Sequence, residues 1–317
     1  MDGLKEIAVS GVRKRGDTTP VTKDDLWHLG SDTKAMTATL AGVFVAEKRL
    51  AWDDRVLSYF LDLTDQVPSA NRRVTIAQLL RHEAGLAVGL PWTSPPAESI
   101  KDQRQRLARL ALAKPSWPPG KFHYSSFDYV VVGAILEKVS GQSWEELMRE
   151  RLFKPLGMHS AGFGGVGTPG RIDQPWPHAA DGTPEPINGY AVDLPQVLGS
   201  AGNVHCTMAD WSKFLVDQLR GAAGINALLP PSIYERMQSP APPSNVGFGW
   251  GIMAQPWWPG KVLTHAGSNG MNYCICLLSP SQGFGVLVCT NQGGDSAEKA
   301  CNEAISTLVR RHFGAPL

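Results

Sequence analysis

The spacing of apolar residues changes near Gly247, and this change separates two kinds of structure along the chain. Beyond Gly247, short apolar runs alternate with glycines and polar turns, which is typical of successive β-strands. The connections between these runs are short, so we expect neighbouring strands to pair antiparallel. The expected elements are a final helix over 296–313 and four strands over 248–253, 262–265, 271–278 and 284–290.

Before Gly247, apolar residues recur at intervals of three and four, the spacing of helices that bury one face. The segment 5–12 is instead typical of a strand, and the Gly- and Pro-rich segment 160–200 is expected to be mostly loop. The expected helices span about 31–48, 75–85, 100–113, 130–139, 144–152, 208–215 and 232–237.

Together these patterns predict an α/β fold of the α+β kind, with an antiparallel sheet flanked by helices and an inserted all-helical domain. The sheet domain is expected to be discontinuous and to combine residues 1–50 with residues 240–317. Residues 51–239 then form the mainly helical domain. Because ligand sites occur preferentially between domains, we expect the functional site at their interface.

The composition narrows the class of protein. The 317 residues are 43% hydrophobic and 19% charged, which is typical of a globular protein with a substantial core. The net charge of +1 favours neither nucleic acid nor a membrane surface as a partner, and no apolar run reaches transmembrane length. The N-terminus lacks a signal-peptide pattern, so the chain as given is expected to be cytoplasmic; a longer natural N-terminus would leave a periplasmic or secreted location open.

Five cysteines are present, and their odd number and their spacing fit no zinc-binding pattern. We expect all five to be reduced and structural, which weakly favours a reducing compartment. They are Cys206, Cys274, Cys276, Cys289 and Cys301.

The candidate chemistry begins with Ser31 and Lys34, a Ser-x-x-Lys motif at the start of an expected helix. Positions three apart share one face of a helix, so the Ser31 hydroxyl and the Lys34 amine can meet. A serine hydroxyl needs a neighbouring base to act as a nucleophile, and a buried lysine can supply one. A serine at a helix start is also a common N-cap, so the motif alone leaves a structural role open.

Three further residues have both a chemical and a structural interpretation. Tyr124 could exchange protons at the site, or it could be a packed aromatic residue at a helix start. His265 could bind substrate, or it could be a strand histidine that hydrogen-bonds its neighbours. His82 could be a base, but a structural histidine at a helix end is the favoured interpretation.

With these residues in place, the sequence resembles the serine β-lactamase and penicillin-binding-protein superfamily. The closer resemblance is to its class C β-lactamase-like branch, which includes family VIII carboxylesterases and D-peptidases. The resemblance covers nearly the whole chain and rests on the order and spacing of seven segments. These are Gly30–Lys34, Leu79–Leu86, Pro119–Ser126, Phe153–Met158, Ala201–Val204, Phe248–Gly251 and His265–Ser268.

The resemblance implies a β-lactamase/DD-peptidase-like fold and a role for each site residue. Ser31 matches the acylated nucleophile, Lys34 its partner base, and Tyr124 the tyrosine that exchanges protons with the leaving group and the incoming water. The backbone N–H groups of Ser31 and Ser268 match the two oxyanion-hole donors. Two more positions match substrate-binding residues on the strand that lines the cleft, His265 and Gly267. The resemblance implies no metal and no cofactor.

Two positions depart from the family's pattern and bear on the substrate. Ser126 stands where the family often has an asparagine that donates to an amide substrate, so Ser126 is a candidate substrate-binding residue with a shorter reach. His265 stands where β-lactamases have a lysine, and a histidine is mostly uncharged at neutral pH. Both changes favour ester hydrolysis, although histidine at this position also occurs in D-peptidases of the family.

The sequence therefore predicts a serine hydrolase that acts through an acyl-enzyme, with a carboxylesterase on small short-chain esters as the leading hypothesis. The alternatives are a D-amino-acid peptidase or weak β-lactamase, and a catalytically inactive binding protein on the same fold. The expected partner is a small ester or amide substrate, with no nucleic acid and no membrane, and the oligomeric state stays open. Five loop tryptophans could shape the pocket or simply pack: Trp92, Trp117, Trp176, Trp257 and Trp258.

Overall fold

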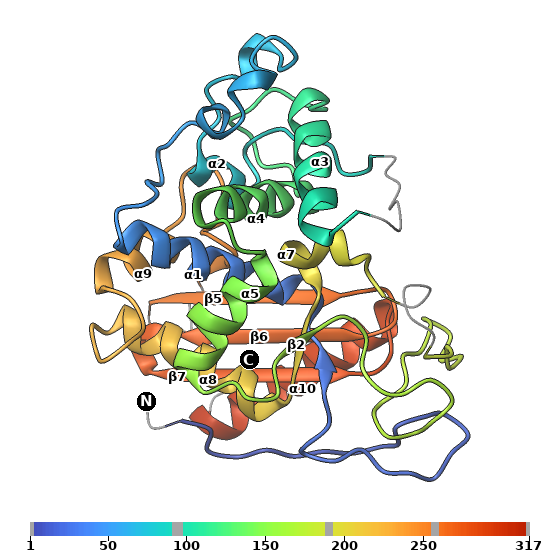
Figure 1. The fold of residues 1–317 in the computed structure, drawn as a ribbon. Coiled ribbons are helices and arrows are strands. Elements are labelled where there is room, and N and C mark those ends of the chain that lie inside the picture. Colours follow the sequence, from blue (N-terminus) through green and yellow to red (C-terminus); the bar gives the residue numbers. More distant parts are fainter. Residues whose placement is uncertain (1–2, 91–97, 188–192, 255–259, 315–317) are drawn as a thin grey trace.

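Two antiparallel sheets and a group of helices make up the fold in the computed structural model, which describes residues 3–90, 98–187, 193–254 and 260–314 (Figure 1). The larger sheet has the strand order β4-β5-β6-β7, as the short connections predict. Each strand pairs antiparallel with its neighbour in the chain. Its strands are β4 (Gly251–Ala254), β5 (Lys261–Ser268), β6 (Tyr273–Ser279) and β7 (Phe284–Thr290).

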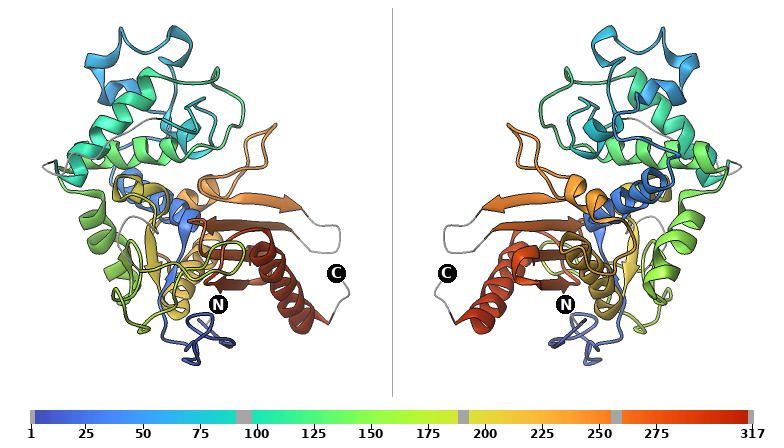
Figure 2. Two further views of the ribbon diagram at one scale, coloured as in Figure 1. Left: turned by 90° about the vertical axis from the view of Figure 1, so that its right-hand side faces the viewer. Right: turned by 90° about the vertical axis from the view of Figure 1, so that its left-hand side faces the viewer.

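Side chains of the larger sheet alternate between two buried faces, because successive residues of a strand point to opposite sides. Along β6, Cys274 and Cys276 join the main core, while Tyr273 and Ile275 join a smaller core. Helix α10 (Asp295–Phe313) covers the smaller core, and helix α8 (Met208–Ala222) contacts β6 and β7. The side views in Figure 2 show α10, in red, packed along the sheet.

A second, three-stranded sheet was not predicted from the sequence. It has the order β1-β3-β2 and consists of β1 (Trp27–His28), β2 (Gly162–Phe163) and β3 (Val204–Cys206). Strands of two or three residues are too short to show a periodic pattern, which is why they escaped the prediction. The strand expected over 5–12 is wrong, since the structure has no strand there and only a single bridge from Val12 to Pro20.

Helix α1 (Thr33–Ala46) runs through the middle of the molecule (Figure 1). It contacts α4 (Ser126–Ser140), α7 (Gly199–Gly202) and α9 (Pro231–Met237). A single 3₁₀ turn, Gly30–Asp32, leads into it and packs against β5. Small and apolar residues occupy nearly every position of α1, so almost the whole helix is buried. Gly42 allows a close approach to α9, because an added Cβ would lie 2.9 Å from Ile233 Cγ2.

The remaining helices agree with most of the expected ranges, with shifts at the ends. The helix expected over 75–85 starts at its capping residue Thr75 but ends at Leu80, because His82 adopts a left-handed backbone with φ of 59°. The other helices are α2 (Ile76–Leu80), α3 (Ile100–Ala113), α4 (Ser126–Ser140), α5 (Trp144–Met148), α6 (Lys154–Leu156), α7 (Gly199–Gly202) and α9 (Pro231–Met237).

The predicted fold class, a mixed α/β fold with antiparallel sheet and flanking helices, is confirmed. All five cysteines are free, as expected. Among the helices within the described ranges, none combines the length and the apolar character needed to cross a membrane.

Candidate active site

Ser31 lies in the 3₁₀ turn before α1, where the chain bends sharply at Gly30. Gly30 has φ of 50°, and an added Cβ would overlap the backbone nitrogen of Ser268 on β5. Only glycine therefore lets this turn approach the strand so closely. The turn places Ser31 between the N-terminal end of α1 and the C-terminal end of β5.

Lys34, one turn further along, is completely buried, and its ammonium is held by two oxygens. Its Nζ donates to Ser31 Oγ at 3.0 Å and to the backbone oxygen of Ala201 on α7 at 2.8 Å. The same nitrogen lies 4.9 Å from the centre of the Tyr124 ring. The three-residue spacing predicted from the sequence thus brings the amine within hydrogen-bond distance of the serine hydroxyl.

Tyr124 approaches Ser31 from the helical side of the molecule. It stands just before Ser125, which caps α4 by accepting from the N–H of Phe127. The Tyr124 hydroxyl lies 2.7 Å from Ser31 Oγ, and the side chain is 42% exposed. The Lys34 amine and the Tyr124 hydroxyl therefore both contact the Ser31 hydroxyl oxygen, although Tyr124 is 93 positions away in the sequence.

Gly267 and Ser268 bring backbone amides of β5 close to the Ser31 turn. An added Cβ at Gly267 would overlap Leu29 O and lie 2.7 Å from the Ser31 nitrogen, so only glycine lets β5 approach the turn this closely. The Ser268 hydroxyl is engaged elsewhere, because it donates to Asn272 O at 2.6 Å and accepts from Gly270 N at 2.9 Å. Ser268 can therefore serve the site only through its backbone.

His265 lies on β5, with its Nδ1 at 2.6 Å from the backbone oxygen of Gly249. Since a carbonyl only accepts, the ring proton is on Nδ1, and Nε2 carries a free electron pair. Burial, together with the nearby Lys34 charge, lowers the pKa of His265 to about 4. At neutral pH this side chain is an uncharged hydrogen-bond acceptor.

The remaining predicted pocket residues are less well placed for chemistry. Ser126 is the first residue of α4, two positions after Tyr124, and is half-buried. Trp117 stacks on the His123 ring at 4.5 Å, and Trp176 is buried beneath Lys14. Trp92, Trp257 and Trp258 lie outside the described residues.

His82 has a partner that the sequence reasoning missed. Its Nδ1 lies 2.8 Å from Asp128 Oδ2 on α4, and its ring centre lies 4.5 Å from that of Tyr124. Both side chains are buried, and burial raises the pKa of Asp128 well above its usual range while it lowers that of His82. The signal was an aspartate inside the otherwise apolar run 127–136.

The backbone N–H of Ser125 also points at His82 Nδ1, at 3.2 Å. Nδ1 is therefore an acceptor, and the protonated carboxyl of Asp128 is its second donor. This neutral pair lies directly behind the Tyr124 ring. His82 is thus a support of Tyr124 rather than a base at the reacting atoms, in agreement with the structural interpretation.

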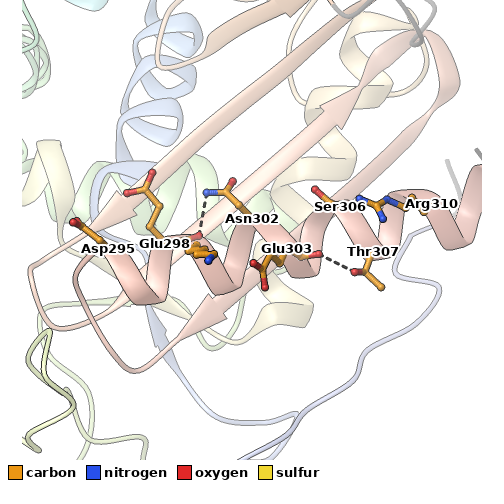
Figure 3. A pocket seen from close by; sticks show the side chains of 8 residues that line it. Asp295, Glu298, Asn302, Glu303, Ser306, Thr307 and Arg310 are labelled. Carbon is orange, nitrogen blue, oxygen red and sulfur yellow. Dashed lines mark hydrogen bonds between the residues drawn. The ribbon is translucent and has the colours of Figure 1, made fainter. Parts of the chain in front are cut away.

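A shallow hollow elsewhere on the surface runs along α10 (Figure 3). Some of its polar side chains hydrogen-bond to the backbone of α10 itself. Asn302 donates to Glu298 O at 3.0 Å, and Thr307 donates to Glu303 O at 2.9 Å. Nothing here joins a nucleophile to a base. The lining residues are Asp295, Glu298, Lys299, Asn302, Glu303, Ser306, Thr307 and Arg310.

Comparison with known proteins agrees with this geometry. The family model described as Beta-lactamase matches residues 2–309. Penicillin-binding protein 4 of Amycolatopsis lactamdurans is 29% identical over 316 residues, which cover 92% of this chain and 79% of that protein. Esterase EstB of Burkholderia gladioli is 30% identical over 209 residues, which cover 60% of this chain and about half, 52%, of that esterase.

A solved structure of a class C β-lactamase from Rhodobacter sphaeroides superposes with a TM-score of 0.73. The superposition covers 95% of this chain and 90% of that one at 21% identity, and it shows a shared fold. The resemblance stated from the sequence motifs is therefore confirmed. With its matched length and its clustered serine, lysine and tyrosine, the chain belongs to the β-lactamase family of serine hydrolases.

Proposed function

We propose that the protein is a carboxylesterase that hydrolyses small short-chain esters through an acyl-enzyme on Ser31. In the first step, Ser31 Oγ attacks the ester carbonyl, and its proton passes to the unit formed by Tyr124 and Lys34. The C–O bond to the alcohol then breaks, and the alcohol leaves with that proton. Water, deprotonated by the same unit, attacks the acyl-enzyme and releases the carboxylic acid and free Ser31.

The backbone N–H groups of Ser31 and Ser268 are proposed to stabilise the oxyanion of each tetrahedral intermediate. The close packing of Gly267 against the Ser31 turn supports this assignment, because it brings the end of β5, where Ser268 lies, next to the Ser31 nitrogen. Donors fixed in advance at such a position supply a large part of the rate enhancement of acyl transfer.

The hydrogen bond of His265 Nδ1 to Gly249 O, together with the lowered pKa of this histidine, favours an ester over a β-lactam or a D-peptide. A substrate carboxylate near His265 would meet the free electron pair of Nε2 instead of a cation. Ser126 adds to this preference, because its hydroxyl has a shorter reach and one donor, whereas an asparagine amide has two. A neutral ester needs neither contact, and its alcohol leaves more easily than an amine.

A D-amino-acid peptidase or weak β-lactamase remains the second candidate. It is favoured by the names of two relatives, penicillin-binding protein 4 and a putative D-alanyl-D-alanine carboxypeptidase of Escherichia coli, which is 28% identical over 145 residues. The hydrogen bonds of Ser31 Oγ to Lys34 and Tyr124 disfavour an inactive binding protein, because a nucleophilic serine needs a base at this distance.

The test compares kcat/KM for p-nitrophenyl butyrate and for nitrocefin, a cephalosporin with a carboxylate. We expect the ester to be the far better substrate of the wild type. The double variant Ser126→Asn with His265→Lys restores the amide donor and the cation. It should raise the nitrocefin-to-ester ratio roughly ten- to a thousand-fold, from the hydrogen-bond energies involved.

His159→Lys serves as the matched control, since it adds the same charge at an exposed histidine. It should leave the ratio unchanged. A wild-type kcat/KM for nitrocefin equal to or above that for the ester would refute the esterase proposal and favour the second candidate.

A further inference from the structure

A buried histidine and a buried aspartate lie beside the Ser31 turn, outside the group of residues that touch the reacting atoms. His28 ends β1, three residues before Ser31, and Asp193 precedes the turn that leads to α7. Their side chains are 1% and 4% exposed, and His28 Nε2 lies 2.7 Å from Asp193 Oδ1. A pair this deeply buried and this close to a nucleophile needs an explanation.

The hydrogen bonds of His28 fix where its proton sits. The backbone N–H of Gly30 donates to His28 Nδ1 at 3.2 Å, so Nδ1 is an acceptor. The ring proton is then on Nε2, which lies 2.7 Å from Asp193 Oδ1, although the direction of this N–H falls outside hydrogen-bond geometry. The imidazole therefore connects Asp193 to the peptide N–H of Gly30, the residue directly before Ser31.

Asp193 accepts its hydrogen bonds on a single carboxyl oxygen. Its Oδ1 accepts from the backbone N–H of Leu194 at 2.7 Å and from Asn269 Nδ2 at 3.5 Å, in addition to its contact with His28. Gly164 leaves room beside the other oxygen, because an added Cβ would lie 3.5 Å from Asp193 Oδ2.

Asn269 links Asp193 to the second donor of the proposed oxyanion hole, the N–H of Ser268. It directly follows Ser268, and its Oδ1 accepts from the backbone N–H groups of Met271 at 3.1 Å and Asn272 at 2.9 Å. Asp193 thus contacts His28, which lies close to the turn with the Ser31 N–H, and Asn269, which directly follows the Ser268 N–H. The two donors come from parts of the chain more than two hundred residues apart.

We propose that Asp193 is a positioning residue that sets the spacing of the oxyanion hole. Through His28 it orients the Gly30 peptide, and with it the Ser31 N–H; through Asn269 it holds the end of β5, and with it the Ser268 N–H. The inference rests on the proposed function, since it needs Ser31 to be acylated. A small misplacement of such donors weakens binding of the tetrahedral intermediate more than binding of the substrate.

The experiment measures kcat and KM for p-nitrophenyl butyrate, and the Ki of phenylboronic acid, which forms a tetrahedral adduct on a reactive serine. We expect Asp193→Asn to lower kcat roughly ten- to a hundred-fold with little change in KM, and to raise the boronate Ki by a similar factor. Asp217→Asn is the control. It alters a carboxylate that is buried away from the site and accepts from Tyr234 OH at 2.6 Å. It should lower the melting temperature without moving kcat or Ki.

His28 variants separate the two halves of the connection and remain informative if Asp193→Asn does not fold. His28→Asn keeps an acceptor for the Gly30 N–H but loses the contact with Asp193. His28→Gln keeps a donor to Asp193 but loses the acceptor. We expect both to lower kcat and raise Ki. We expect the loss in the double variant of Asp193→Asn and His28→Asn to be smaller than the product of the single losses, because both variants remove the contact between His28 and Asp193.

Three results would overturn the inference. The first is a kcat and a boronate Ki within two-fold of wild type in Asp193→Asn or in both His28 variants. The second is an equal loss in Asp217→Asn, and the third is additive losses in the double variant. An inactive wild type with no labelling of Ser31 would instead be a failure of the proposed function, so the two failures are distinguishable.

Discussion

Two histidine–aspartate pairs flank Ser31, and they hold their protons in opposite ways. In the pair of His28 and Asp193, the ring proton is on Nε2, 2.7 Å from Asp193 Oδ1. In the pair of His82 and Asp128, a protonated carboxyl donates to the imidazole. The same two residue types thus place the proton between them on the imidazole in one pair and on the carboxyl in the other.

The surroundings explain the difference. Asp193 Oδ1 accepts hydrogen bonds from two further N–H donors, those of Leu194 and Asn269, so this oxygen acts as an acceptor. Asp128 is entirely buried, and among the described residues its Oδ1 has no hydrogen-bond partner. Its charge would be uncompensated there, so the proton stays. The comparison teaches that the donors around a pair, rather than its two members, decide which member holds the proton.

The largest expected effect concerns Lys34 and Tyr124, the two residues that contact the Ser31 hydroxyl between these pairs. We expect Lys34→Ala and Tyr124→Phe each to lower kcat roughly a hundred- to ten-thousand-fold, because each removes proton transfer at Ser31. The double variant should lose little more, since residues that act as a unit are non-additive. Steady-state kinetics with p-nitrophenyl butyrate measures this, and multiplicative losses would show that the two residues act independently.

A much smaller effect is expected from Asp128→Asn, in contrast to Asp193→Asn. An asparagine amide can donate to His82 Nδ1 much as the protonated carboxyl does, so kcat should stay within a few-fold of wild type. If the two Asp→Asn variants lose activity equally, the proposed contrast between the pairs is wrong.

The same variant makes a prediction about pH and stability. Burial raises the pKa of Asp128 in the folded protein, so its contribution to stability is fully present below the unfolded pKa, about 4, and declines as the pH rises. The asparagine side chain of the Asp128→Asn variant does not titrate. Urea unfolding at pH 4 to 8 should therefore show wild type losing stability relative to the variant, by at most about 1.4 kcal/mol per pH unit. A difference that is constant with pH would contradict the assigned proton.

Much of the fold was predictable because it is built from long periodic elements. The four strands after Gly247 and the helix α3 (Ile100–Ala113) lie where the apolar pattern places them. The pattern could not show the three-stranded sheet, whose pairing of Trp27 with Cys206 depends on contacts between distant segments. Nor could it show the early end of α2, which the left-handed backbone of His82 causes.

The candidate site also contains residues that the sequence predicts and residues that it does not. Ser31 and Lys34 are three positions apart, so their contact follows from helix geometry alone. The place of Tyr124 came only from the resemblance, because no local rule connects it with Ser31. Asp193 and Asp128 were missed entirely, since their roles arise from burial and from partners on other elements.

The most direct test of the account is whether Ser31 is the residue that is acylated. A fluorophosphonate probe transfers its phosphonyl group to an activated serine oxygen and releases fluoride. Intact-mass measurement followed by peptide mapping should find one label, on Ser31, in the wild type and none in Ser31→Ala. A label on another serine, or undiminished labelling of Ser31→Ala, would contradict the assignment of the nucleophile on which the proposed mechanism rests.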